Sequence, residues 1–326
     1  MFVKRRHSLW STINWSKWPF LIGAIYGLTI SASFYYLEVP IALPWEPLGV
    51  LGIAVAFYLG FKNNSSYDRA WEARKIWGSI VNNSRTFGAA VTSFVHQDQE
   101  REIQKELIYR HIAWMTSLRH QLRLSKPWEH IENRINGLYA PTVCEDYHNK
   151  LASELEEYLS TSEIEMLEGK TNMAAQILKI QSQRLQELRD QNFFDDFRHM
   201  EFHQLISSFY TDQGKSERIK NFPFPRQYAS VGFWFTVIFC VIVPLGLIDI
   251  IEKETILWMC PFLSGLITWV FFLMEKIGDY SENPFEGTYN DTPITAISRG
   301  IEIDMREMIH DTNIPQQHKE QNGYLM

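Results

Sequence analysis

The sequence predicts an all-α membrane protein with four transmembrane helices and a large helical cytoplasmic region. Three observations support this prediction. Four uncharged apolar segments form two pairs, a long charged stretch between the pairs shows helical periodicity, and basic residues gather on one side of the expected spans. The mean hydropathy of -0.21 hides this pattern because it averages apolar stretches with charged ones.

The first apolar pair lies near the N-terminus. Residues 18–37 form 20 uncharged residues, which match a hydrocarbon core about 30 Å thick at about 1.5 Å per residue. Residues 47–61 follow after a short connection and give 15 uncharged residues, which is short for a span taken alone. No small-residue cleavage pattern follows the first segment, so we expect it to be retained and not removed as a signal peptide.

The second pair lies in the last third of the chain. Residues 227–248 and 255–274 are free of charge. They are separated only by residues 249–254, which include Asp249, Glu252, Lys253 and Glu254. This arrangement predicts a second transmembrane hairpin.

Basic residues near the spans predict the orientation, because short cytoplasmic flanks carry an excess of Lys and Arg. The two short hairpin connections hold one basic residue between them and are expected on the outer side. Both termini are then cytoplasmic. We expect a multi-pass protein of the inner (plasma) membrane of the cell. The basic residues that flank the spans are Lys4, Arg5, Arg6 and Lys17, then Lys62, Arg69, Arg74 and Lys75, and finally Lys215, Arg218, Lys220 and Arg226.

The chain therefore divides into four predicted parts. Residues 1–61 hold an N-terminal cytoplasmic segment and the first hairpin, and residues 62–226 form a cytoplasmic helical region. Residues 227–274 form the second hairpin. Residues 275–326 form an acidic cytoplasmic arm.

Composition excludes several classes of protein. A net charge of -7 and a pI of about 5.8 argue against a nucleic-acid binder, which needs excess Lys and Arg to neutralise phosphates. Cys144, Cys240 and Cys260 are widely spaced and show no zinc or disulfide pattern. The dinucleotide, Walker A and GxSxG motifs are missing. We expect no cofactor, no bound metal and no enzymatic activity.

Bulky apolar residues follow one stripe of the second predicted span. Ile53, Phe57 and Phe61 lie at positions i, i+4 and i+8, so they cover about 12 Å of one helix face. If several copies surrounded an axis, these side chains would form three stacked apolar rings, which gate ion flow by dewetting. On spacing alone, a face turned toward lipid or toward a helix bundle is the favoured interpretation of the stripe.

Polar residues follow this stripe directly. They could form an ion vestibule where the second span leaves the membrane. The alternative is a solvated helical segment whose charges pair at three- and four-residue spacing. The residues of this neck-exit cluster are Asn63, Asn64, Asp68 and Arg69.

Two other groups of residues raise the question of metal binding. His199 and His203 have the spacing that can place two imidazoles on one metal, but this signal is weak and an exposed amphipathic helix is the favoured interpretation. Asn283, Asn290 and Asp291 lie in a turn-rich stretch after the last span and could bind a cation through their oxygen atoms. A simple turn between helices is the alternative, because the stretch lacks the order of an EF-hand loop.

Three motifs in this order resemble the bestrophin family, and in particular its bacterial homologues. They are GFKNNSSYDRAWEARKIWG at 60–78, ERIKNFPFPRQY at 217–228 and ENPFEGTYNDTPI at 282–294. Together with the two hairpins, they extend the resemblance from about residue 1 to about residue 310.

The resemblance implies a homopentamer around a single central pore, with the second span lining a narrow neck. Ile53, Phe57 and Phe61 align with the hydrophobic neck positions of the family. The family also has a cytoplasmic constriction, which counting back from Pro225 places near Phe197.

This sequence departs from the animal members after its NPF motif. Those members continue with a run of acidic residues that helps to chelate calcium, whereas here only scattered acidic residues such as Glu286 and Asp291 follow. The resemblance implies that Asn283, Asn290 and Asp291 are the remains of a cation clasp. Calcium gating is therefore not expected. Animal and plant members resemble anion channels, whereas a bacterial member can favour monovalent cations.

These arguments predict an ion channel for small anions such as chloride, with a sodium or potassium channel of the same fold as the alternative. Its partners are the permeating inorganic ions, the lipid bilayer and further copies of the chain, and not nucleic acid. Two other classes remain as alternatives: a membrane enzyme with a metal at His199 and His203, and a membrane-anchored scaffold that carries no current.

Overall fold

The computed structural model describes residues 1–4, 8–95, 100–130, 147–253, 257–288, 290–321 and 323–325. Cys144, Arg5, Arg6 and the predicted start of the fourth span at 255–256 lie outside these residues. The regular secondary structure of the described residues is helical apart from isolated bridges, so the all-α prediction is confirmed. Its elements are α1 (Leu9–Leu37), α2 (Trp45–Phe94), α3 (Glu100–Arg123), α5 (Tyr147–Leu155), α6 (Thr161–Leu167), α7 (Met173–Asp190), α8 (Asp196–Asn221), α9 (Arg226–Lys253), the 3-10 turn η1 (Leu257–Met259), α10 (Cys260–Asp279) and α11 (Ile294–Met308).

The chain forms two compact units. The first, here called the apolar unit, contains residues 4–69 and 223–283. The second, here called the polar unit, contains residues 1–3, 70–222 and 284–326. Helix α2 runs without interruption from one unit into the other, so the helix does not end at residue 61, where its apolar segment stops.

Three described helices are long and apolar enough to cross a membrane: Thr12–Leu37, Arg226–Ile251 and Cys260–Asp279. They match three of the four predicted spans. The remaining predicted span, the second one at 47–61, is the start of α2, whose apolar stretch is short and leads directly into charged residues. Its role as a membrane span therefore remains a prediction.

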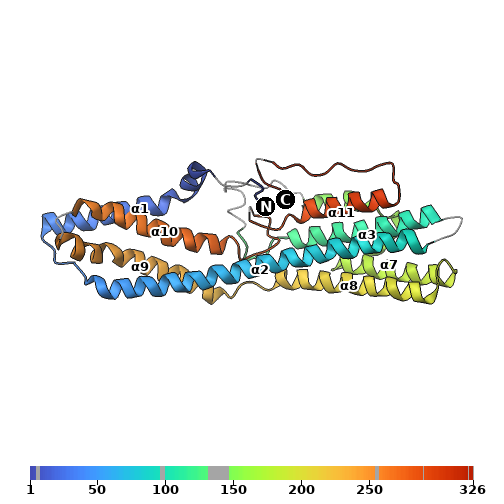
Figure 1. The fold of residues 1–326 in the computed structure, drawn as a ribbon, viewed down its shortest axis with the longest axis horizontal. Coiled ribbons are helices and arrows are strands. Elements are labelled where there is room, and N and C mark those ends of the chain that lie inside the picture. The colour runs from blue at the N-terminus through green and yellow to red at the C-terminus, as the bar shows by residue number, and fades with distance from the viewer. Residues whose placement is uncertain are drawn as a thin grey trace. The chain divides into compact units, whose positions relative to one another are not determined.

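Small residues let α1 and α10 pack closely within the apolar unit, where the two helices lie side by side (Figure 1). A Cβ added to Gly23 would lie 2.6 Å from the Thr268 hydroxyl oxygen. A Cβ added to Gly27 would lie 2.7 Å from the Ser264 side chain. Close approach of small residues is the usual way in which membrane helices associate, because lipid supplies no hydrophobic driving force between them.

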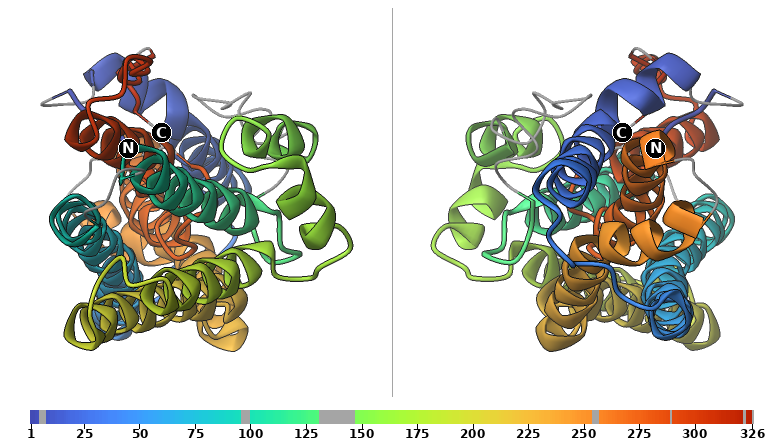
Figure 2. Two further views of the ribbon diagram at one scale, coloured as in Figure 1. Left: turned by 90° about the vertical axis from the view of Figure 1, so that its right-hand side faces the viewer. Right: turned by 90° about the vertical axis from the view of Figure 1, so that its left-hand side faces the viewer.

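Helix α3 lies at the centre of the polar unit, between α11 and α7 (Figure 2). Large side chains from several helices fill the core around it, which explains why the sequence shows apolar stripes at helical spacing here. The largest of the buried aromatic residues are Trp77, Phe87, Trp114, Phe202 and Phe209.

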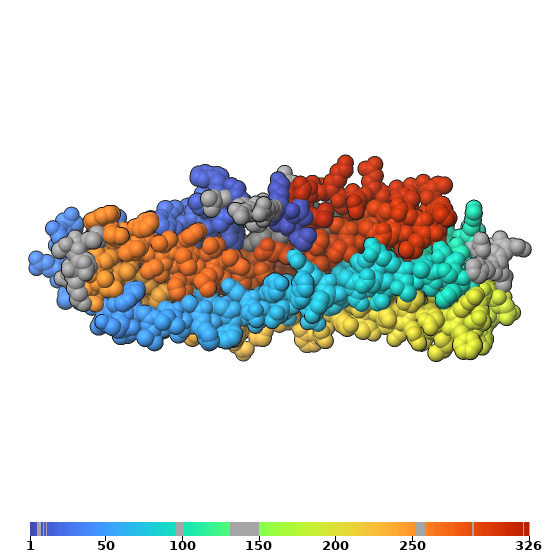
Figure 3. All heavy atoms as spheres, in the orientation of Figure 1, coloured from blue at the N-terminus to red at the C-terminus, as the bar shows by residue number. Residues whose placement is uncertain are grey.

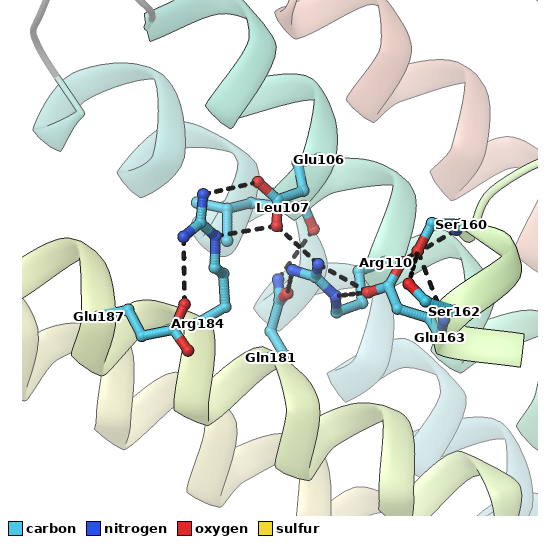
Figure 4. A network of polar contacts seen from close by, with 9 residues as sticks. All are labelled: Glu106, Leu107, Arg110, Ser160, Ser162, Glu163, Gln181, Arg184 and Glu187. Carbon is cyan, nitrogen blue, oxygen red and sulfur yellow. Dashed lines mark hydrogen bonds and ion pairs between the residues drawn. The ribbon is translucent and has the colours of Figure 1, made fainter. Parts of the chain in front are cut away.

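A network of charged side chains joins α3, α6 and α7 of the polar unit (Figure 4). The Arg110 guanidinium donates to Glu106 at 2.7 Å, to Glu163 at 2.7 Å and to Gln181 at 2.9 Å. Arg184 donates to the same Glu106 at 2.9 Å. The network satisfies a nearly buried cation, which would otherwise be costly.

The C-terminal segment lies on the surface of the polar unit together with α11, both red in Figure 3. The rings of Phe2 and Tyr324 lie 5.2 Å apart, and the Val3 amide donates to the Gly323 carbonyl at 2.9 Å. The two ends of the chain therefore lie side by side in this unit.

Candidate pore-lining site

One face of α2 in the apolar unit is apolar and uncovered. Ile53, Phe57 and Phe61 are 73%, 67% and 50% exposed in the single chain. The rings of Phe57 and Phe61 contact each other edge to face, with centroids 4.5 Å apart. The predicted stripe is therefore a continuous exposed surface.

The opposite face of α2 is buried. Val55 and Leu59 lie in one cluster with Phe239 and Val243 of the neighbouring helix α9 (Figure 1). Because α2 packs on this side only, its face with Ile53, Phe57 and Phe61 remains exposed. The exposed stripe is thus not part of the core of the chain and must meet lipid, water or another copy.

The predicted neck-exit cluster divides into two pairs. Asn64 and Asp68 are exposed on the same side of α2 as the stripe, as expected for positions that follow Phe57 by 7 and 11 residues. Asn63 and Arg69 turn away from it. The Asn63 amide donates to the Met274 carbonyl at 3.1 Å, and Arg69 Nε donates to the Glu282 carbonyl at 2.9 Å.

A buried ion pair lies next to this cluster and was not predicted from the sequence. Lys62 Nζ lies 2.8 Å from Glu275 Oε1, and the two side chains are 0% and 12% exposed. In the sequence, Lys62 is one of the basic residues that follow the second span, and nothing in that pattern indicates burial. The available signal was its helical register, which places Lys62 about 140° around α2 from Phe57 and so on the buried face.

Phe197 lies in the first turn of α8, in the polar unit, and is 86% exposed. The carboxylate of Asp195 caps this helix by accepting from the Arg198 amide at 2.9 Å. The cap fixes where the helix begins, and Phe197 projects from its surface without packing against the core. This exposure is what a ring-forming residue needs.

The two histidines of the metal hypothesis differ in environment. The His199 ring stacks on Phe194 with centroids 6.2 Å apart, whereas His203 is exposed. Burial and the nearby His203 lower the pKa of His199. Within the described ranges, no three His, Cys, Asp or Glu side chains are grouped so that they could hold a metal ion.

The residues of the predicted cation clasp are distributed over both units. Asn283 ends the second segment of the apolar unit, whereas Asn290 and Asp291 belong to the polar unit. The Asp291 carboxylate is buried, forms an ion pair with Arg123 and accepts from the Phe285 amide at 2.8 Å. In the polar unit, Asp291 therefore holds the turn together through partners of its own chain.

Comparison with known proteins gives one consistent result. Residues 14–307 match the family model described as bacterial/fungal bestrophin protein. Voltage-dependent anion channel-forming proteins of Ralstonia nicotianae and of Escherichia coli K12 are 28% and 27% identical to this chain. These alignments cover 90% and 86% of this chain, and 87% and 82% of the relatives.

A solved structure of a bestrophin homologue from Klebsiella pneumoniae has the same fold, with a TM-score of 0.76 at 21% identity. The match covers 91% of this chain and 99% of that one. The family model spans most of the sequence, including the three motifs and the exposed stripe of α2. The chain belongs to the bacterial and fungal bestrophin family.

Proposed function

We propose that five copies of this chain form a membrane channel that conducts small anions such as chloride. The observation that carries this proposal is the uncovered apolar face of α2 at Ile53, Phe57 and Phe61. The names of the relatives as voltage-dependent anion channel-forming proteins support the choice of ion.

In this proposal the three side chains from each copy form stacked rings around a shared axis. A pore lined by such rings stays dry while it is narrow, because water and ions lose their hydrogen bonds and hydration there. Current flows when the rings move apart and the neck fills with water. Flow is passive and needs no covalent chemistry.

The remaining predicted features take their place around this neck. Asn64 and Asp68 border its inner end, and Phe197 forms a second constriction in the cytoplasmic part. The start of α2 is a membrane span, the second in chain order. Residues 62–226 and 275–326 and both termini lie in the cytoplasm, and the channel resides in the plasma membrane.

Reversal potentials test this function. The purified protein is reconstituted in planar bilayers with a gradient of potassium chloride, and single-channel currents are recorded. We expect a reversal potential near the equilibrium potential of chloride. A potential near that of potassium would identify the cation channel, and no current in any salt would support the scaffold.

A further inference from the structure

We propose that Lys62 and Glu275 form a positioning pair, which sets the rotation of α2 and so holds the Ile53, Phe57 and Phe61 face in its closed arrangement. This inference rests on the proposed function of that face. Neither residue touches the proposed pore, and both act through the helix that carries it.

The first argument is the burial of the pair. The Lys62 side chain is fully buried, and its Nζ lies 2.8 Å from Glu275 Oε1. Charges removed from water are stable only when their partner is close and well placed. A small movement of either helix would therefore be opposed strongly, whereas an exposed ion pair would permit it.

The second argument is the angle between the pair and the stripe. Lys62 follows Phe61 directly and lies about 140° around the helix from Phe57. Any rotation of α2 about its own axis that turned Phe57 would carry Lys62 away from Glu275. The pair thus opposes rotation of α2.

Further contacts hold the same stretch of α2 against α10 and against the residues that follow α10. Asn63 donates to the Met274 carbonyl at 3.1 Å, and Arg69 donates to the Glu282 carbonyl at 2.9 Å. A Cβ added to Gly278 would lie 2.0 Å from Asn63 Oδ1, so the absence of a side chain there permits the close approach. The charged pair lies within this clamp, directly next to the last ring of the neck.

Charge exchange tests the pair. We expect Lys62→Gln and Glu275→Gln each to raise the open probability in bilayers by about 5-fold or more, the lower end of typical couplings between sites. The double variant Lys62→Glu with Glu275→Lys should return it to within about 2-fold of the wild type, because the pair is restored. Arg85→Gln is the matched control, since Arg85 also lies on α2 and pairs with Asp304 of α11 but is exposed. This control should leave the current unchanged.

The outcomes separate this inference from the proposed function. If substitution of the three neck residues changes the current while Lys62→Gln and Glu275→Gln do not, the channel remains and the positioning pair is refuted. Single variants that raise the current without recovery in the exchanged double variant also refute the pair.

A second measurement is used if the protein carries no current, or if the single variants do not assemble. Phe57→Cys is introduced, and its rate of modification by a water-soluble thiol reagent is compared between backgrounds. We expect faster modification with Lys62→Gln and a rate like the wild type in the exchanged double variant. Equal rates in the wild type and Lys62→Gln, or an altered rate in the exchanged variant, overturn the inference. Size-exclusion profiles in detergent show which variants assemble.

Discussion

His111 lies in the core of the polar unit, where its ring stacks on Phe87 and its Nε2 lies 2.9 Å from the Ser84 hydroxyl. Burial lowers the pKa of His111 from 6.5 to about 3. The folded protein therefore holds a neutral ring, whereas the unfolded chain binds a proton below pH 6.5. The resulting stability is complete above the unfolded pKa and is lost as the pH falls toward about 3.

We expect the free energy of unfolding to fall by about 1 kcal/mol between pH 6.5 and 5.5 because of His111 alone, and by about 1.4 kcal/mol for each pH unit below that interval. Urea unfolding of the detergent-solubilised protein, followed by tryptophan fluorescence at pH 6.5 and 5.5, measures this loss. His111→Gln is the control, since it is less stable at both pH values but lacks this part of the pH dependence. An equal slope in the variant would assign the acid sensitivity to other groups.

Asp291 provides a second prediction for a single residue. Its carboxylate compensates the buried Arg123 and accepts amide hydrogen bonds from Phe285 at 2.8 Å and Gly287 at 2.7 Å. Asp291→Asn leaves the arginine charge buried without its counter-charge, so we expect a loss of about 3–5 kcal/mol in the free energy of unfolding. Thermal or urea unfolding measures it, with the exposed pair variant Asp304→Asn as the control.

Calcium distinguishes this internal role of Asp291 from a cation site. Because Arg123 already neutralises the carboxylate, we expect calcium and chelators to leave the unfolding temperature of the wild type unchanged. A calcium-dependent rise that Asp291→Asn abolishes would show that the turn binds the ion.

Helix α2 shows which features of an element could be predicted from the sequence. The stripe at Ile53, Phe57 and Phe61 follows from spacing, and helical register alone would have separated Asn64 from Asn63. The length of the helix did not follow, because backbone hydrogen bonds continue through Lys62 whatever the polarity of the side chains. The partner of Lys62 is 213 residues away, so no local pattern could identify it.

Replacement of all three neck residues tests the role of α2 as the helix that lines the pore. We expect the triple variant Ile53→Ala, Phe57→Ala and Phe61→Ala to raise single-channel conductance or open probability, because smaller side chains widen the neck and let water enter. Planar-bilayer recordings measure both quantities. Unchanged currents would remove these residues from the gate.

A matched control for the neck variant lies on α1. Ile22, Ile25 and Leu28 are also exposed apolar side chains of the apolar unit, at 63%, 65% and 57%. Their triple replacement by Ala removes a similar apolar surface from a helix that we do not place at the pore. We expect the currents of this variant to equal those of the wild type.

At the scale of the whole molecule, the predicted helical class and three of the four predicted spans agree with the structure. They could be predicted because a long uncharged segment in lipid must satisfy its backbone hydrogen bonds within a helix. It does not predict the two compact units, since α2 passes through both and their contacts join distant parts of the chain. Phe197 and the clasp residues were placed by resemblance, and their roles remain predictions.

The assembly itself gives the last prediction. A single chain exposes the large apolar side chains of α2, and a pore on a shared axis needs several copies to enclose it. We expect native mass spectrometry in detergent to find five times the chain mass of 38.3 kDa. In such an assembly Phe57→Cys places several thiols around one axis, and cadmium ions, which bind thiolates, should block the current. Ile25→Cys should be insensitive to cadmium, because Ile25 lies on α1, a helix that we do not place at the pore. A monomeric mass, or equal cadmium sensitivity of the two variants, would place the α2 stripe against lipid instead of a pore.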